Sequence, residues 1–298
     1  KVKYHWKAKY HVVIVGSGIG GISAAQTLAG HGLDILLIDE NAHPGGQLLR
    51  KSETSSRRFF NFKPDMVKTK GFSLIKKVND ACSEIDRIHQ AQVLGIFNDR
   101  RLLIHTEGNK NQNIPRVKNQ NSGQVIEVQA EHLILATGAS MIWPEQFPSE
   151  FEGEGIILTL PDLVESLGQS NGPQPGNIVV WDKDQSSATY DAVLWLAEKF
   201  GNVFLLTSQA GFAMSESLIN RQGILHRLRL SKVKLLVSSK LTVTEADLTE
   251  GVVKYNDIAT ESRGRIENVS ALTYASPRVP RLDLLPDLEA AGIVPHII

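Results

Sequence analysis

Short apolar runs alternate along the chain with segments of helical periodicity. Residues 11–16 (HVVIVG) and 34–39 (DILLID) are nearly all apolar and rich in β-branched residues, the pattern of parallel strands buried on both faces. Between them, residues 19–31 carry apolar positions at helical spacing. A strand, a glycine-rich turn, a helix and a second strand in this order predict a βαβ unit.

Predicted helices and strands continue toward the middle of the chain. Residues 70–87 show helical spacing, whereas residues 91–97 form an apolar run typical of a strand. Residues 101–106 and 124–129 are expected to pair as strands across a polar, Asn-rich loop. Residues 132–138 (HLILATG) predict a further buried strand that ends in small residues.

A second βαβ unit follows a stretch rich in Gly, Pro and Ser at residues 168–176. It consists of a strand over 177–182, a helix over 187–201 and a strand over 202–207, with more strand expected over 252–274.

We therefore expect an α/β protein with a Rossmann-like FAD/NAD(P)-binding fold. Its first domain, with a three-layer parallel sheet, would comprise residues 1–170 and 275–298. Residues 171–274 would form a second, degenerate nucleotide-binding-like domain.

Composition narrows the functional classes. Lys plus Arg number 32 and Asp plus Glu number 32, so the net charge is zero, which argues against nucleic-acid binding. No apolar run reaches the roughly 18 to 20 residues that span a bilayer, and no secretory signal pattern is present, so we expect no membrane span and a cytoplasmic location. The chain starts without Met and ends on an apolar run, so we expect it to be part of a longer polypeptide.

The first βαβ unit carries a phosphate-binding motif in its turn. The motif G-x-G-x-x-G is formed by Gly16, Ser17, Gly18, Ile19, Gly20 and Gly21. Gly16 permits a tight turn, Gly18 lets the backbone approach a pyrophosphate, and Gly21 allows the helix to pack on the strand. The helix N-terminus then presents free N–H groups and the positive end of the helix dipole.

Asp39 ends the second predicted strand, where a carboxylate can accept hydrogen bonds from the ribose of an adenosine. Glu40 is adjacent and takes this role if the register differs by one residue. Either acid would repel the 2′-phosphate of NADP, so the motif favours FAD, NAD or ADP, and spacing alone leaves these three open.

Further motifs resemble those of the glutathione-reductase-like flavoproteins with two dinucleotide-binding domains. They are Pro44-Gly45-Gly46-Gln47-Leu48 and Leu133-Ile134-Leu135-Ala136-Thr137-Gly138-Ala139. The resemblance implies that Gly45, Gly46 and Gln47 lie near the flavin end of FAD. It also implies that Ala136, Thr137 and Gly138 close over the cofactor and that Val93 contacts the adenine. FAD is therefore favoured over NAD at this site.

Two groups within this superfamily resemble the chain most. Residues 177–207 and 274–298 resemble the carboxy-terminal module of trimethylamine dehydrogenase and 2,4-dienoyl-CoA reductase, where it is fused to an old-yellow-enzyme-like barrel. Residues 88–106 and 131–158 resemble the FAD subunits of opine, sarcosine and proline dehydrogenases. The resemblance implies an amine, imino or enoyl-type small-molecule substrate and a further redox centre on another domain or partner subunit.

The chain departs from the family pattern in several places. The turn after the strand over 177–182 contains no glycine and carries Asp182 and Asp184, so we expect the second domain not to bind NAD(P)H. The single cysteine, Cys82, excludes a disulfide-reductase mechanism. The chain stops after His296-Ile297-Ile298, where family members continue with a Gly-Asp that holds the flavin. The sequence offers no catalytic acid or base and no metal-ligand spacing.

Three hypotheses follow from the sequence. The favoured one is an FAD-dependent oxidoreductase, or a module of one, that transfers electrons from its substrate to another redox centre. The alternative is a non-catalytic module that binds ADP as a structural or regulatory ligand. An NAD-dependent dehydrogenase without flavin comes third, because the GGQ and ATG turns would then lack a role.

Overall fold

The computed structural model describes residues 7–41, 44–46, 85–106, 124–168 and 173–294. The chain forms two compact units. Among the described residues, unit 1 comprises those up to residue 139 and those from residue 280 onward, and unit 2 comprises residues 140–279. The division into domains at residues 170 and 275, which the sequence led us to expect, stays a prediction. Both units contain helices and strands, and the α/β fold class is confirmed.

Unit 1 contains a six-stranded sheet in which parallel and antiparallel strands meet. The strand order is β3-β2-β1-β6-β5-β4, where β1 is Lys7–Val15, β2 Ile35–Ile38, β3 Asp86–Ile88, β4 Ala91–Phe97, β5 Arg101–Thr106 and β6 Gln124–Leu135. Strands β3, β2, β1 and the second half of β6 run parallel, whereas β4, β5 and the first half of β6 form an antiparallel meander. The predicted pairing of residues 101–106 with 124–129 is confirmed.

Two elements differ from the sequence prediction. The strands expected over 124–129 and 132–138 form one strand, β6, which ends at Leu135. Its continuation past residue 130 is stabilised by parallel pairing with β1, where Val12 faces His132 and Val15 faces Leu135. Residues 86–87, expected at the end of a helix, belong to β3 and pair with β2, so this part of the prediction was wrong. The rest of the predicted helix up to residue 84, including Cys82, lies outside the described residues.

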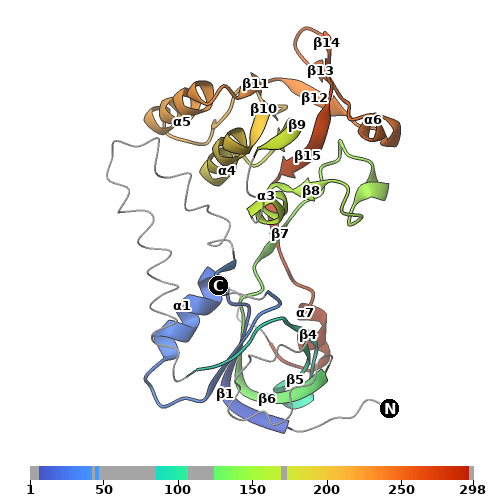
Figure 1. The fold of residues 1–298 in the computed structure, drawn as a ribbon. Coiled ribbons are helices and arrows are strands. Elements are labelled where there is room, and N and C mark those ends of the chain that lie inside the picture. Colours follow the sequence, from blue (N-terminus) through green and yellow to red (C-terminus); the bar gives the residue numbers. More distant parts are fainter. Residues whose placement is uncertain (1–6, 42–43, 47–84, 107–123, 169–172, 295–298) are drawn as a thin grey trace. The chain divides into compact units, whose positions relative to one another are not determined.

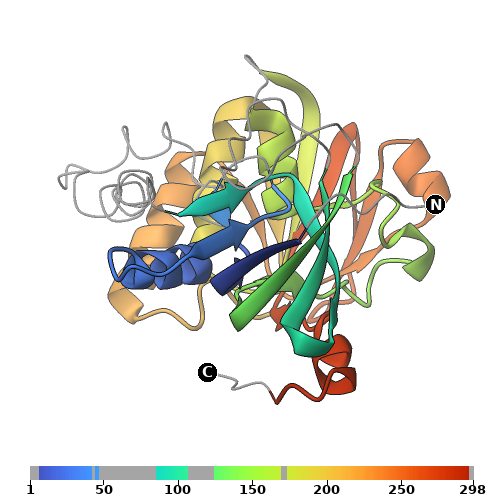
Figure 2. The same cartoon turned by 90° about the horizontal axis from the view of Figure 1, so that it is seen from below.

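Both faces of β1 are buried, which explains its apolar run. Val12 and Ile14 belong to a cluster with Ile22 of helix α1 (Ile19–Leu28). Val13 belongs to a second cluster, which includes Leu288 of helix α7 (Leu285–Ala290). Successive side chains of a strand point to opposite faces, so a strand covered on both sides is apolar throughout. In Figures 1 and 2, α1 and α7 lie on opposite sides of the strands of unit 1.

Unit 2 repeats the architecture with a five-stranded parallel sheet. Its order is β11-β10-β9-β15-β8, where β8 is Leu158–Thr159, β9 Gln174–Asp182, β10 Phe200–Leu206, β11 Lys234–Leu236 and β15 Val269–Ala275. Its helices are α3 (Leu160–Gly168), α4 (Ser187–Lys199), α5 (Leu218–Leu230) and α6 (Glu245–Thr249). An antiparallel sheet of β12 (Ser239–Thr242), β13 (Val253–Asp257) and β14 (Arg263–Ile266) is inserted before β15, and β7 (Ala139–Met141) pairs with β16 (Arg278–Pro280). The predicted second βαβ unit, β9-α4-β10, is confirmed.

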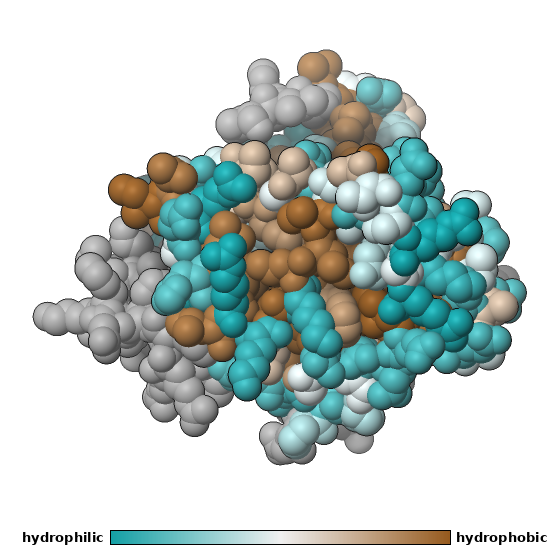
Figure 3. All heavy atoms as spheres, turned by 90° about the horizontal axis from the view of Figure 1, so that it is seen from above, coloured by the Kyte–Doolittle hydropathy of each residue, from teal (hydrophilic) through white to brown (hydrophobic). Residues whose placement is uncertain are grey.

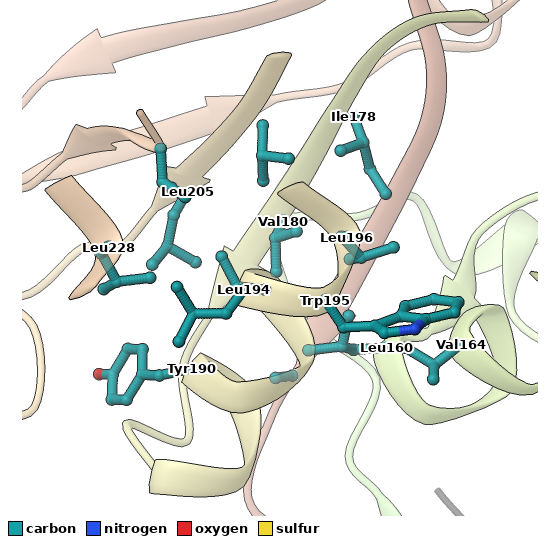
Figure 4. Close-up of a cluster of buried hydrophobic side chains, with 14 of the residues drawn as sticks. Leu160, Val164, Ile178, Val180, Tyr190, Leu194, Trp195, Leu196, Leu205 and Leu228 are labelled. Atoms are coloured by element: carbon teal, nitrogen blue, oxygen red, sulfur yellow. The ribbon is translucent and has the colours of Figure 1, made fainter. Parts of the chain in front are cut away.

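The core of unit 2 forms where α4 packs on the parallel sheet. Leu194 and Leu196 of α4 are buried together with Val180 of β9 and Leu205 of β10. Figure 4 shows these side chains between helix and strands, with the ring of Tyr190 at the border of the cluster and its hydroxyl at the outer end. The position of this hydroxyl matters for the turn that precedes α4.

The surface mixes hydrophilic and apolar side chains, as Figure 3 shows for one face. Large apolar residues are also exposed in unit 2, among them Leu218 and Ile219, whose exposed fractions are 69% and 85%. Within the described residues, no helix combines the length and the apolar character that crossing a membrane requires.

Candidate nucleotide-binding site

The glycine-rich turn of unit 1 lies at the carboxyl end of β1, between β2 and β6. The backbone N–H of Gly16 donates to the carbonyl of Ile38 at 2.8 Å, and the N–H of Ala136 donates to the carbonyl of Val15 at 2.7 Å. Gly16 has a φ of +100°, and a Cβ atom there would overlap the carbonyl group of Ala136. Only glycine fits this position, because both the dihedral angle and the space exclude a side chain.

Gly21 permits the closest approach between helix α1 and the turn. A Cβ atom at Gly21 would overlap the carbonyl oxygen of Gly16 and lie 3.4 Å from the Cβ of Ala136. A Cβ at Gly20, in contrast, would make an ordinary contact of 3.8 Å with Ala136. The predicted packing role of the last glycine therefore agrees with the geometry at Gly21.

Gly18 leaves the N-terminus of α1 open. It is the N-cap residue of the helix, and no side chain of the described residues caps it. A Cβ atom at Gly18 would meet no other atom of the described part of the chain within 4 Å. The first N–H groups of an α-helix have no partner within the helix, so this opening offers hydrogen-bond donors and the positive helix dipole to an anion. Ile19, the next motif residue, is exposed beside it.

Asp39 faces this turn. Its side chain is 7% exposed, and one carboxylate oxygen accepts hydrogen bonds from the backbone N–H and the hydroxyl of Ser17, at 2.5 and 2.7 Å. The other oxygen accepts from the backbone and side-chain amides of Asn41, at 2.8 and 3.0 Å. These bonds fix the carboxylate as an acceptor beside the open helix end, where the ribose of an adenosine would lie.

The Gly45-Gly46 turn packs directly on the glycine-rich turn. The N–H of Gly45 donates to the carbonyl of Ser17 at 2.8 Å, and a Cβ at Gly46 would lie 3.1 Å from the Cα of Gly18. The structure thus brings together two motifs that are almost 30 residues apart in the sequence. Gln47, the third predicted residue of this turn, lies outside the described residues.

The ATG turn is hydrogen-bonded to Arg281, which follows strand β16. The hydroxyl of Thr137 donates to the carbonyl of Arg281 at 2.9 Å, and the N–H of Arg281 donates to the carbonyl of Gly138 at 3.0 Å. The guanidinium of Arg281 also forms an ion pair with Glu40 at 2.6 Å. Glu40 therefore has a partner of its own, and Asp39 is the acid that faces the turn.

The expected adenine contact, Val93, is half-buried and packs against the core of unit 1. The start of β4 is nearer to Asp39, since the N–H of Ala91 donates to the carbonyl of Asp39 at 2.9 Å. The role of Val93 stays a prediction. Sequence reasoning missed Asn41, Ala91 and Arg281 as neighbours of the predicted site. Asn41 follows Asp39 by two positions, so its place beside the predicted ribose acid could have identified it. Nothing in the local sequence pattern marks Arg281.

The corresponding turn of unit 2 is filled by side chains. Asp182, the last residue of β9, is fully buried, and its carboxylate accepts hydrogen bonds from the backbone N–H of Gln185 at 2.9 Å and from the hydroxyl of Tyr190 at 3.0 Å. Burial, and to a smaller extent the neighbouring Asp184, raises the pKa of Asp182 to about 7. Burial and then Asp182 also raise the pKa of Tyr190 well above its usual value.

In the described part of the chain, no group of three or more His, Cys, Asp or Glu side chains is placed to hold a metal ion. The arrangement in unit 1 instead combines an open helix N-terminus with a fixed carboxylate. It can bind a diphosphate and an adjoining sugar.

Comparison of the sequence with known families agrees with this geometry. A family model described as pyridine nucleotide-disulphide oxidoreductase matches residues 10–181. Ferroptosis suppressor protein 1 of Taeniopygia guttata is 24% identical over 237 residues, and that of Homo sapiens is 26% identical over 238 residues. These matches cover 78% and 79% of this chain but 54% of each relative, so the chain spans about half the length of the curated relatives it matches.

Solved structures share the fold at low sequence identity. Thioredoxin reductase of T. acidophilum superposes with a TM-score of 0.64 at 18% identity and covers 93% of this chain and 80% of its own. Histamine dehydrogenase from Rhizobium sp. 4-9 has a TM-score of 0.61 at 17% identity and covers 98% of this chain and 39% of its own. An amine oxidase from Pseudomonas geniculata N1 that acts on 6-hydroxypseudooxynicotine has a TM-score of 0.61 at 16% identity, with 97% and 38% covered. At such identities the likeness shows the fold alone.

Proposed function

We infer the function from one premise: the chain belongs to the pyridine nucleotide-disulphide oxidoreductase family, whose model matches more than half of its residues. Binding of FAD or NAD(P) is a property of this family's fold. We propose that the chain is an FAD-dependent oxidoreductase, or a module of one, and that the ADP half of FAD binds at the glycine-rich turn of unit 1.

One observation carries this proposal: among the described residues, the space beside Gly18 at an uncapped helix N-terminus is empty. The diphosphate would lie there and accept hydrogen bonds from the backbone N–H groups of the first helical turn. Asp39, already oriented toward the turn, would accept hydrogen bonds from the ribose hydroxyls. The same carboxylate disfavours a 2′-phosphate by charge repulsion, which supports FAD over NADP.

The flavin is proposed on the resemblance of the GGQ and ATG turns. The contact of Gly45 with Ser17 sets the first of these turns against the phosphate-binding turn, where it can follow a dinucleotide past its diphosphate. When bound, FAD supplies the hydride or electron chemistry, while the chain binds and orients it. The backbone around Gly18 would hold the diphosphate, Asp39 the ribose, and Thr137 and Gly138 would close over the cofactor.

For the substrate, we propose an amine, imino or enoyl-type small molecule. Two of the structural neighbours are a histamine dehydrogenase and an amine oxidase, which supports the amine class. The chain covers 39% and 38% of these two proteins. We propose accordingly that a further redox domain or subunit completes the reaction, as in the trimethylamine dehydrogenase group.

A substitution at Gly18 tests the cofactor site with little risk to the fold. In the Gly18→Thr variant, a β-branched side chain would enter the space assigned to the diphosphate. Threonine is about as good an N-cap residue as glycine, and the backbone angles of Gly18 (φ −68°, ψ −172°) suit any residue. We expect FAD affinity, measured by titration calorimetry and flavin absorbance, to fall about tenfold or more, equivalent to at least about 1.4 kcal/mol, with an unchanged melting temperature.

Gly20→Ala is the matched control for this experiment. It adds one methyl group in the same motif, and this group would make only an ordinary van der Waals contact with Ala136. We expect this variant to bind FAD like the parent protein. Unchanged FAD affinity in Gly18→Thr would refute the assignment of the diphosphate to this turn.

A second candidate function is a non-catalytic ADP-binding module. It is favoured by one observation: the turn of unit 2 is filled by the side chains of Asp182 and Gln185, whereas Gly18 and Asp39 of unit 1 would both contact the ADP half. Calorimetric titrations with ADP and with FAD separate the two functions. Tighter binding of FAD than of ADP supports the flavoenzyme, and equal affinities support the ADP module.

A further inference from the structure

The two βαβ units of the chain differ in whether a side chain caps the N-terminus of their helix. In unit 1, the N-cap of α1 is Gly18, which has no side chain and faces a space that none of the described side chains fills. In unit 2, the N-cap of α4 is Ser186, whose hydroxyl oxygen accepts a hydrogen bond from the N–H of Thr189 at 3.3 Å. The N-terminus that a dinucleotide fold offers to phosphate is therefore capped from within the chain in unit 2.

A carboxylate completes this internal cap. One oxygen of Asp184 accepts hydrogen bonds from the backbone N–H of Ser186 at 3.0 Å and from the hydroxyl of Thr189 at 2.8 Å. The other oxygen accepts from the hydroxyl of Ser186 at 3.0 Å. An anion with three donors already lies at the helix end, where its negative charge is stabilised by the helix dipole.

Beneath this carboxylate, a closed network fills the rest of the turn. Asp182 is bonded to Gln185 and Tyr190, and the side-chain amide of Gln185 also donates to the hydroxyl of Thr207 at 3.3 Å. The carbonyl oxygen of that amide accepts from the N–H of Met214 at 3.2 Å. The turn has no glycine, so the backbone cannot come close to a diphosphate without displacing these side chains.

We propose that Asp184 is an internal substitute for the diphosphate of a pyridine nucleotide and thereby determines the specificity of unit 2 against NAD(P)H. The carboxylate lies at the end of α4 where a phosphate would bind, accepts from the N–H of Ser186 and the hydroxyls of Ser186 and Thr189, and repels a second anion by its charge. On the proposed function, it follows that the flavin receives its electrons from a donor other than a pyridine nucleotide held in unit 2. Such a donor is an oxidisable small molecule or a second redox centre.

Anion rescue of an Asp184 variant tests the proposal. Asp184→Ala removes the internal anion and takes this acceptor from the N–H of Ser186 and from the hydroxyls of Ser186 and Thr189, so the melting temperature is expected to fall by several degrees. Inorganic pyrophosphate is then expected to restore much of this loss at constant ionic strength. The parent protein is the reference, because any pyrophosphate bound to unit 1 contributes equally to both. Asp184→Asn, which keeps an acceptor oxygen but no charge, should lie between the two.

The proposal is overturned if pyrophosphate shifts the parent and Asp184→Ala by the same amount, or if the variant melts like the parent without added anion. A second measurement addresses the electron donor: the FAD-loaded parent is titrated with NADH and NADPH under anaerobic conditions. We expect the visible flavin absorbance to persist, and rapid, saturable bleaching would overturn the inference. Failure to bind FAD would contradict the proposed function, while the unfolding experiment would still decide the role of Asp184.

Discussion

Replacing Gly21 by alanine is expected to lower the free energy of unfolding by about 3 kcal/mol or more, the upper end of what overpacking costs. The added methyl group would overlap the carbonyl oxygen of Gly16, which belongs to the backbone and cannot rotate away. Helix α1 would therefore have to move away from the turn that contains Gly16. Domains are typically stable by about 5 to 15 kcal/mol, so this loss is a large fraction of the total.

Urea denaturation measures this effect as the free energy of unfolding of Gly21→Ala, with Gly20→Ala as the control. Gly20 lies next to Gly21 in the same helix, but a methyl group there meets only ordinary contacts, so Gly20→Ala is expected to gain about 0.5 to 1 kcal/mol in helix propensity. Adjacent glycines should thus respond with opposite signs. Equal responses would show that the helix does not approach the turn as closely as the structure indicates.

The glycine motif could be recognised in the sequence because its information is local. A buried strand, a tight turn and a helix that must approach the strand each restrict one or two neighbouring positions, and those restrictions appear as the apolar run before Gly16 and the glycines after it. The same holds for β9, α4 and β10, whose apolar patterns are continuous. The missing glycine after β9 was equally visible, and the structure explains it by the side chains of Asp182, Asp184 and Gln185.

Features that depend on distant partners could not be predicted in this way. The pairing of β6 with two different neighbours, antiparallel with β5 and parallel with β1, turns two expected strands into one. Arg281 reaches Glu40 across 241 positions of the sequence, and no local pattern marks either residue as the partner of the other. The bonds of Tyr190 to Asp182 and to the N–H of Ala213 likewise arise only when α4 packs on the sheet.

The network around Asp182 makes the stability of the protein depend on pH. Burial raises the pKa of Asp182 from 3.8 to about 7, so the folded protein favours the protonated carboxyl more than the unfolded chain does. Its contribution to stability is therefore fully present below about pH 4 and is lost as the pH rises to about 7. Shifts of this size correspond to about 4 kcal/mol at most. The pKa values of Asp247 and Asp257 are lowered, so these groups act with the opposite sign and in a more acidic range.

Asp182→Asn isolates this contribution, because asparagine stays neutral at every pH. The variant loses an acceptor for the side-chain amide of Gln185, so at pH 4 it is expected to be somewhat less stable than the parent. Between pH 4 and pH 8 the balance should move in favour of the variant by a few kcal/mol in urea denaturation. Asp257→Asn is the control, since the hydrogen bond from the backbone N–H of Thr260 lowers the pKa of Asp257 and confines its titration to more acidic pH, so its difference from the parent should stay nearly constant between pH 4 and pH 8. A pH-independent difference between Asp182→Asn and the parent would mean that Asp182 titrates as an ordinary carboxyl, and the buried network would then not hold it in its protonated form.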